Sequence, residues 1–239
     1  MLTAIVSLLA LGIVWAKQKP QNRKSSGPAE GFLADEQRAL NFYKVFSAVY
    51  DILNPRLYTD SMRKEMVSQI QDGVNLRVLD VGCGTGYTTK GVLELKNSRE
   101  VVALDMNPVQ LKRAVKNLSR QKDKAFILRG DADNLPFADQ SFDAVVSVGA
   151  VEYFPDPNKV LKEFARVTRP QGTIIVGGPA IDWFRKLAMN KIFYTPSAAE
   201  LQNAFLKANL TNINSEMTGV KTFFGTSNYV VFATGKKPN

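Results

Sequence analysis

Residues 78–87 read Val78-Leu79-Asp80-Val81-Gly82-Cys83-Gly84-Thr85-Gly86-Tyr87, an apolar run that leads into three closely spaced glycines. This pattern predicts a buried strand, a glycine-rich turn and a helix that opens directly after it. Glycine lets the backbone approach a ligand closely, and a helix N-terminus offers free N–H groups and positive potential. A dinucleotide-binding turn, G-x-G-x-x-G, would place its third glycine at position 87, where Tyr87 stands. The G-x-G-x-G pattern therefore favours a different ligand.

Short apolar runs alternate with helical patterns beyond this motif. Alternation of strand and helix predicts a mainly parallel sheet with helices on both faces, and two strand-like runs at the end predict a terminal antiparallel hairpin. Helical spacing at 34–50 and 59–71 predicts an N-terminal helical cover, with Thr59 or Asp60 as N-cap of the second helix. The fold class is thus α/β with a seven-stranded sheet, whose strands are expected at 77–81, 101–105, 125–128, 142–148, 173–176, 211–217 and 228–234, with helices such as 109–118 and 159–167 between them.

Acidic residues follow two of the predicted strands. Asp105 ends the strand at 101–105, where a carboxylate can accept hydrogen bonds from both ribose hydroxyls of a nucleoside. Its alternative role is that of a helix N-cap before Pro108. The segment Gly130-Asp131-Ala132-Asp133-Asn134-Leu135-Pro136-Phe137 follows the strand at 125–128, and its alternative role is that of a solvated acidic loop.

These landmarks, together with residues 141–147 and the turn Arg169-Pro170-Gln171-Gly172, resemble the class I S-adenosylmethionine-dependent methyltransferases. The resemblance implies a Rossmann-like domain that binds S-adenosyl-L-methionine, with Asp131 accepting from the adenine amino group and the Ala132 N–H meeting the ring. The cofactor contacts that it implies are Tyr50, Asp80, Gly82, Cys83, Gly84, Gly86, Asp105, Met106, Asp131, Ala132 and Ser147.

Two further stretches bear on the substrate. Residues 45–54, with Met62-Arg63 after them, resemble the N-terminal signature of the ubiquinone/menaquinone biosynthesis C-methyltransferases. Residues 147–157 resemble most closely the plastid 2-methyl-6-phytyl-1,4-benzoquinol methyltransferases. Two features depart from these families: Val151-Glu152 stands where the first carries an Arg-Asn pair, and the apolar anchor of the second is C-terminal. The resemblance implies C-methylation of a prenylated benzoquinol or naphthoquinol.

Such a reaction gains from a general base, because removing a phenolic proton makes the ring a better nucleophile. The chain contains no histidine, which excludes the usual base, and no spacing of ligands that is typical of a metal site. Glu152 is the first candidate for the base and Asp51 the second, while Tyr50 and Tyr153 can orient the phenol. The alternative role of Glu152 is a helix-capping or cofactor-lid carboxylate.

The N-terminus is apolar and then basic. Residues 1–16 carry no charged side chain, and Lys17, Lys19, Arg23 and Lys24 follow. This order predicts an uncleaved membrane anchor whose C-terminal side stays in the cytoplasm or an equivalent reducing compartment. A secretory signal peptide is the alternative, since Val14-Trp15-Ala16 loosely resembles a cleavage site. Residues 17–31 read as a polar linker, so the methyltransferase domain is expected at 32–239.

The formal net charge of +9 suits an anionic partner. With the anchor, it favours a membrane surface and a lipophilic small-molecule substrate over nucleic acid. Residues 181–194 mix aromatic, aliphatic and basic side chains, which fits either an interfacial helix or a cover helix packed on the sheet.

Three other functions stay open. One is a methyltransferase for another membrane lipid or small amphiphile, such as a phospholipid amine or a sterol. Another is a nucleic-acid methyltransferase, but Gly149-Ala150-Val151-Glu152 lacks the Pro-Pro-aromatic motif usual after the fourth strand. The last is a non-catalytic, cofactor-binding membrane protein.

Overall fold

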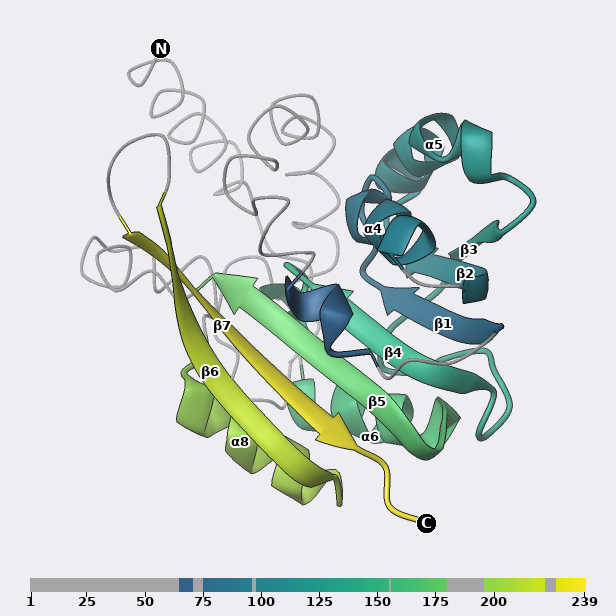
Figure 1. The fold of residues 1–239 in the computed structure, drawn as a ribbon. Coiled ribbons are helices and arrows are strands. Elements are labelled where there is room, and N and C mark those ends of the chain that lie inside the picture. Colours follow the sequence, from purple (N-terminus) through teal and green to yellow (C-terminus); the bar gives the residue numbers. More distant parts are fainter. Residues whose placement is uncertain (1–64, 71–74, 96–97, 155, 180–195, 222–226) are drawn as a thin grey trace, which may run out of the picture.

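A seven-stranded sheet forms the centre of the computed structural model, which describes residues 65–70, 75–95, 98–154, 156–179, 196–221 and 227–239. The strand order is β3-β2-β1-β4-β5-β7-β6 (Figure 1). Strands β3 through β5 run parallel, and β7 and β6 are antiparallel to their neighbours. The predicted sheet with its terminal hairpin is therefore confirmed. The strands are β1 (Leu76–Val81), β2 (Ser98–Asp105), β3 (Ala125–Arg129), β4 (Phe142–Val148), β5 (Thr168–Pro179), β6 (Thr211–Lys221) and β7 (Ser227–Lys236).

Alternate residues of the central strands enter two separate cores, because successive side chains of a strand point to opposite faces. On one face Leu79 and Val145 pack with Phe164 of α6 (Pro157–Val167) and Phe205 of α8 (Ala198–Lys207). On the other face the core contains Val92 of α4 (Tyr87–Leu95), residues 66, 67 and 70, and Val78, Val101, Ala144 and Val146 of the strands. The short helical piece at 65–68 is the described part of the predicted N-terminal cover.

Helix α5 (Pro108–Asn117) covers the sheet beside α4, over β2 and β3. Leu111, Ala114 and Leu118 are buried against Ala103 and Ala125 of those strands. The short helix η2 (Ser119–Gln121) extends α5, and the short helix η3 (Val151–Tyr153) follows β4. Helices α4 and α5 thus lie on one face of the sheet, and α6 and α8 lie on the other (Figure 1).

Two local features differ from the sequence expectations. Strand β5 begins at Thr168, whereas a turn was expected at 169–172; Gln171 has a positive φ of 61°, and the register with β4 shifts there, so the strand absorbs an irregularity instead of stopping. Helix α8 was not predicted, although Ser197 and Glu200 form a capping box that marks its start.

No helix among the described residues is long and apolar enough to cross a membrane. The predicted anchor (1–16), the linker (17–31), the helix at 34–50 and the segment at 181–194 all lie outside those residues.

Candidate cofactor site

The strand order reverses between β1 and β4, which are parallel neighbours. In an open α/β sheet, ligands bind outside the carboxyl ends of the strands at such a switch point. The turn after β1 contains Gly82, Gly84 and Gly86, and the turn after β4 contains Gly149 and Ala150. The fold therefore brings together two turns that the sequence separates.

The glycines of the β1 turn meet two different demands. All three have positive φ angles, 70° at Gly82, 55° at Gly84 and 86° at Gly86, which L side chains adopt only with strain. A Cβ at Gly82 would lie 2.3 Å from the Cβ of Ala150, so the two turns touch at this point. A Cβ at Gly84 would meet nothing within 4 Å. Gly82 is therefore needed for packing, whereas Gly84 faces open space.

The turn is tied to the elements below it. The Thr89 hydroxyl of α4 donates to the buried Asp80 carboxylate of β1 over 2.6 Å, which fixes the start of the helix against the strand. The N–H groups of Gly82 and Cys83 both donate to the Leu104 carbonyl of β2. The Cys83 side chain packs beneath the turn against Ala103 and Leu111, and burial raises the pKa of its thiol well above the ordinary value. Cys83 therefore presents only its backbone to a ligand over the turn.

Asp105 lies at the carboxyl end of β2, beside the glycine turn. Its carboxylate accepts the Gly84 N–H over 2.9 Å and the Asn107 N–H over 2.8 Å. Burial raises the pKa of this carboxyl, and the bonds from Asn107, Gly84 and Met106 act in the opposite direction. The N-cap of α5 is Asn107, whose side chain accepts the Val109 N–H, so Asp105 does not have the alternative capping role. A carboxylate has about four acceptor sites, so beyond these backbone bonds Asp105 keeps acceptor capacity for a hydroxyl donor.

The loop after β3 carries Asp131 and Ala132. Asp131 is exposed, and its carboxylate accepts the Asp133 N–H over 3.3 Å. Ala132 packs against the core on the α6 side of the sheet. Lys159 of α6 forms an ion pair with Asp133 over 3.0 Å. The loop therefore forms a turn at Asp131–Asp133, and the ion pair between Asp133 and Lys159 connects it to α6.

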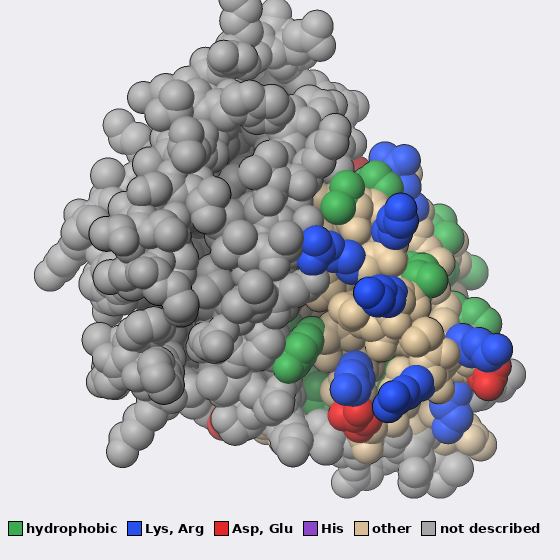
Figure 2. Space-filling view, turned by 90° about the horizontal axis from the view of Figure 1, so that it is seen from above, with side chains coloured by type: hydrophobic (Ala, Val, Ile, Leu, Met, Phe, Trp, Pro, Cys, Tyr) green, Lys and Arg blue, Asp and Glu red, His purple; other side chains and the backbone are tan. Residues whose placement is uncertain are grey.

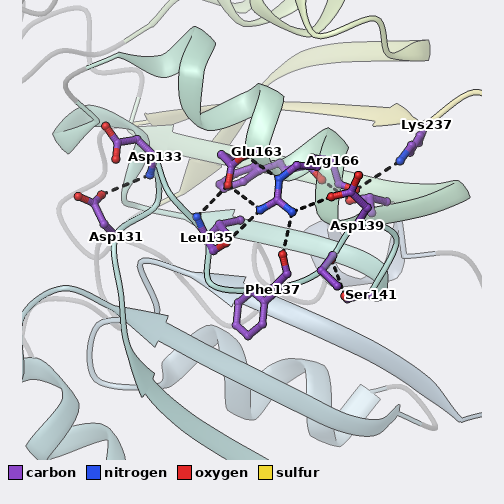
Figure 3. A network of polar contacts seen from close by, with 12 residues as sticks. Asp131, Asp133, Leu135, Phe137, Asp139, Ser141, Glu163, Arg166 and Lys237 are labelled. Atoms are coloured by element: carbon purple, nitrogen blue, oxygen red, sulfur yellow. Dashed lines mark hydrogen bonds and ion pairs between the residues drawn. The ribbon is translucent and has the colours of Figure 1, made fainter.

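Arg166 of α6 holds the second half of the same loop (Figure 3). Its guanidinium donates to the carbonyls of Leu135 (3.0 Å) and Phe137 (2.7 Å) and to the carboxylates of Asp139 and Glu163 (2.8 Å each). Glu163 in turn accepts the Leu135 N–H over 2.8 Å, and its bond to Arg166 is the main reason that its pKa is lowered. This network fixes the path of the chain from the acidic loop into β4.

We expect Arg166→Ala to lower the free energy of unfolding by about 2–3 kcal/mol, because it leaves two carboxylates and two carbonyls without their charged donor. Arg166→Lys should recover little of this loss, since an ammonium cannot replace the planar fork. Arg169→Ala is the matched control: Arg169 is more exposed, pairs with Asp143, and should cost less than about 1 kcal/mol. Urea unfolding followed by circular dichroism measures all three variants. Equal losses for Arg166→Ala and Arg169→Ala would contradict the role given to Arg166.

The remaining expected residues are placed as follows. Ser147 is fully buried in β4, and its hydroxyl has no hydrogen-bond partner in the described ranges. Met106 follows Asp105, and its carbonyl accepts the Arg129 side chain. Glu152 and Tyr153 belong to η3, directly after the turn that touches Gly82, and Tyr153 is partly buried. Tyr50 and Asp51 lie outside the described residues.

The sequence patterns above did not identify two buried polar side chains at the start of α5. Asn107 and Gln110 are 4% and 3% exposed, and the Asn107 Nδ2 and Gln110 Oε1 atoms have no partner among the residues that the structure describes. Both lie close in sequence to Asp105. The dipeptide Asn107-Pro108, an N-cap followed by proline at the first helical position, was the available signal for Asn107.

Comparison with known proteins finds similar sequences that are named as methyltransferases. Residues 79–176 match a family described as a methyltransferase domain. The chloroplastic 2-methyl-6-phytyl-1,4-hydroquinone methyltransferase 2 of Oryza sativa subsp. japonica is 34% identical over 201 residues, which is 81% of this chain and 56% of the rice protein. The chain thus spans less than two thirds of that relative's length.

Two further similarities have narrower scope. The demethylmenaquinone methyltransferase of Lactiplantibacillus plantarum is 35% identical over 116 residues, 47% of this chain and 49% of that protein. A chain in the solved complex of a Haloferax volcanii methyltransferase activator with its methyltransferase aligns with a TM-score of 0.68 at 21% identity, covering 82% of this chain and 96% of its own length. At that identity the structural match shows the fold alone.

Proposed function

Because the chain belongs to the class I S-adenosylmethionine-dependent methyltransferases, we propose that it transfers a methyl group from S-adenosyl-L-methionine to a ring carbon of a prenylated benzoquinol or naphthoquinol. The observation that carries the cofactor assignment is the open glycine turn beside a carboxylate. Gly84 has free space above it, and the Asp105 carboxylate, which keeps acceptor capacity for a hydroxyl, is bonded to the Gly84 N–H. The substrate assignment follows the relatives that are named as quinol or menaquinone methyltransferases.

The residues of the switch point fit this cofactor. The β1 turn, with Asp80, Gly82, Cys83, Gly84 and Gly86, would hold the amino-acid end through backbone groups, and Asp105 would accept from the ribose. Adenine would lie against Met106 and Ala132, with Asp131 accepting from its amino group. Ser147 and Tyr50 would complete the site. When bound, the cofactor supplies an activated sulfonium methyl group, so positioning of the ring supplies much of the acceleration.

We expect Asp105→Asn to weaken cofactor binding roughly 100-fold, because hydrogen bonds to a charged acceptor are worth about 1.5–3 kcal/mol each. In the wild type, the raised pKa means that Asp105 is protonated at a higher pH than an ordinary aspartate. Affinity should therefore fall as the pH drops through that pKa, and Asp105→Asn should lack this dependence. The unliganded fold behaves in the opposite way: the stability that the raised pKa contributes is present at low pH and is lost as the pH rises through it.

Calorimetric titration with S-adenosylhomocysteine at several pH values measures both effects. Asp123→Asn, which changes an exposed carboxylate in the turn after η2, is the control and should bind as the wild type does. A pH-dependent affinity that persists in Asp105→Asn would assign the titration to another group.

The proposed acceptor chemistry needs a phenolic proton to be removed. We assign this to Glu152, with Asp51 as the second candidate, and give Tyr153 the task of orienting the phenol. The placement of η3 supports the choice, because this short helix follows the β4 turn whose Ala150 touches Gly82 at the cofactor turn. Glu152 would therefore belong to the segment next to the methyl donor.

The proposal extends to the N-terminal part of the chain. Residues 1–16 would anchor the protein in a membrane, 17–31 would act as a linker, and the domain from 32 to 239 would work on the cytoplasmic or equivalent reducing side. A membrane position suits a lipophilic substrate. The support is the uncharged stretch followed by four basic residues at 17–24.

The test is transfer of labelled methyl. The purified full chain is incubated with methyl-labelled S-adenosylmethionine and a reduced lipid extract, and the labelled lipids are separated by mass; Asp105→Ala serves as the inactive control. Label in a prenylated quinol supports the proposal and identifies the ring and the tail. Label in a phospholipid or sterol keeps the methyl transfer and replaces the substrate. Cofactor binding with no labelled lipid would favour a non-catalytic role.

A further inference from the structure

The basic charge of the chain is concentrated on one helix and its extension. Residues 108–124, which comprise α5, η2 and the turn after it, contain six Lys or Arg and one Asp. They contribute a net charge of +5 to the formal +9 of the whole chain. We call the side chains of Lys112, Arg113, Lys116, Arg120, Lys122 and Lys124 the α5 basic face.

Most of these cations are exposed and unneutralised. Lys112, Lys116, Arg120, Lys122 and Lys124 are exposed and form no ion pair with any carboxylate in the described part of the chain. On the opposite face of the sheet, by contrast, Lys159 and Arg166 of α6 each pair with acidic residues. Figure 2 looks down on the α4 and α5 end of the molecule, where Lys and Arg side chains gather with few acidic ones among them.

The packing of α5 explains why these side chains share one surface. Leu111, Ala114 and Leu118 are buried against β2 and β3, which turns the intervening positions outward. Lys112 and Lys116 are one helical turn apart, so they form a row along the solvent side. Val115 lies between them in sequence and is 57% exposed. The helix dipole favours a cation in the last turn, which accounts for Lys116 but not for the rest.

We propose that the α5 basic face docks on a membrane surface that contains anionic phospholipids. Basic clusters beside an exposed apolar side chain fit headgroups and the upper acyl region. Residues 108–124 contain no aromatic side chain on which a base could stack, so single-stranded nucleic acid fits less well. Helix α5 and η2 run from just after Asp105 to just before β3, so docking would lay the α5 side of the sheet along the lipid. This inference concerns binding and does not depend on which substrate is methylated.

The test compares two matched double variants of the full chain. Lys112→Gln/Lys116→Gln removes two cations of the α5 basic face, and Lys162→Gln/Lys207→Gln removes two exposed lysines from α6 and α8 on the other face. Co-sedimentation is measured with vesicles of phosphatidylcholine alone and with 30% phosphatidylglycerol added. The apolar N-terminal residues are present in every variant, so the ratio of the affinity for vesicles with phosphatidylglycerol to the affinity for vesicles without it isolates the electrostatic part of binding. Each lost cation should lower this ratio roughly fivefold.

We expect Lys112→Gln/Lys116→Gln to lower this ratio by roughly 25-fold at low salt and Lys162→Gln/Lys207→Gln to change it less than about twofold. Unchanged thermal unfolding of both variants confirms that the fold is intact. The proposal is overturned if both double variants lose the same amount, since net charge alone would then act. It is also overturned if the wild type shows no preference for anionic vesicles, or if the α5 variant loses affinity for RNA while binding vesicles normally.

Discussion

Gly82→Ala is expected to lower the free energy of unfolding by more than about 3 kcal/mol, a large share of the stability of a domain. The new Cβ would lie 2.3 Å from the Cβ of Ala150, closer than any real contact, and both atoms belong to buried or near-buried turns. Relief requires the β1 and β4 turns to separate. The positive φ of 70° adds strain of about 1–2 kcal/mol.

Gly84→Ala is the matched comparison two residues away. It has a similar positive φ of 55°, but its Cβ would point into open space. We expect a cost of only about 1–2 kcal/mol in stability, together with a loss of cofactor binding because the methyl group occupies the space over the turn. Thermal unfolding and titration with S-adenosylhomocysteine separate the two effects. Similar stability of Gly82→Ala and Gly84→Ala would show that the two turns are not held together as described.

Glu152→Gln is expected to lower kcat by roughly 100-fold or more while leaving cofactor affinity unchanged, since positioned general bases contribute about 10²–10⁴. The substitution keeps the size of the side chain and removes its basicity. Turnover is measured with the quinol identified by the labelling experiment, and the dissociation constant is measured separately.

Asp51→Asn tests the second candidate in the same assay. A large fall in kcat for Asp51→Asn with near-normal turnover for Glu152→Gln would move the base to Asp51. Near-normal turnover of Glu152→Gln with weakened cofactor binding would instead identify Glu152 as a lid carboxylate. Normal turnover in both variants would mean that proximity and orientation are sufficient for this reaction.

Local patterns predicted much of the secondary structure. The predicted strand at 142–148 agrees with β4, and 109–118 agrees with α5 to within a residue. The errors arose where a local signal was weak or overlooked. Strand β5 continues through Gln171 because a register shift with β4 accommodates its positive φ, which periodicity does not encode. Helix α8 could have been predicted from Ser197 and Glu200, because the side chain of each accepts a hydrogen bond from the backbone N–H of the other in a capping box.

The candidate site was predictable only in part. Asp105 was identified from its place at the end of a strand, but its bond to the Gly84 N–H depends on how β1 and β2 align, whereas the capping role of Asn107 is local. The burial of the Asn107 Nδ2 and Gln110 Oε1 atoms, which have no hydrogen-bond partner among the described residues, could not be predicted, because burial of a polar side chain is decided by the elements that pack over it.

The sequence by itself determined the strand, turn and helix around Gly82, Gly84 and Gly86, the alternation that makes the sheet parallel, and the family. These features depend on local conformational preference and on the period of apolar residues, which neighbouring positions carry. Only the tertiary structure decided that Ala150 closes against Gly82 and that Arg166 holds the loop at 135–139. Those contacts join residues far apart in the chain, and strand order and helix packing, which no local pattern specifies, bring them within reach.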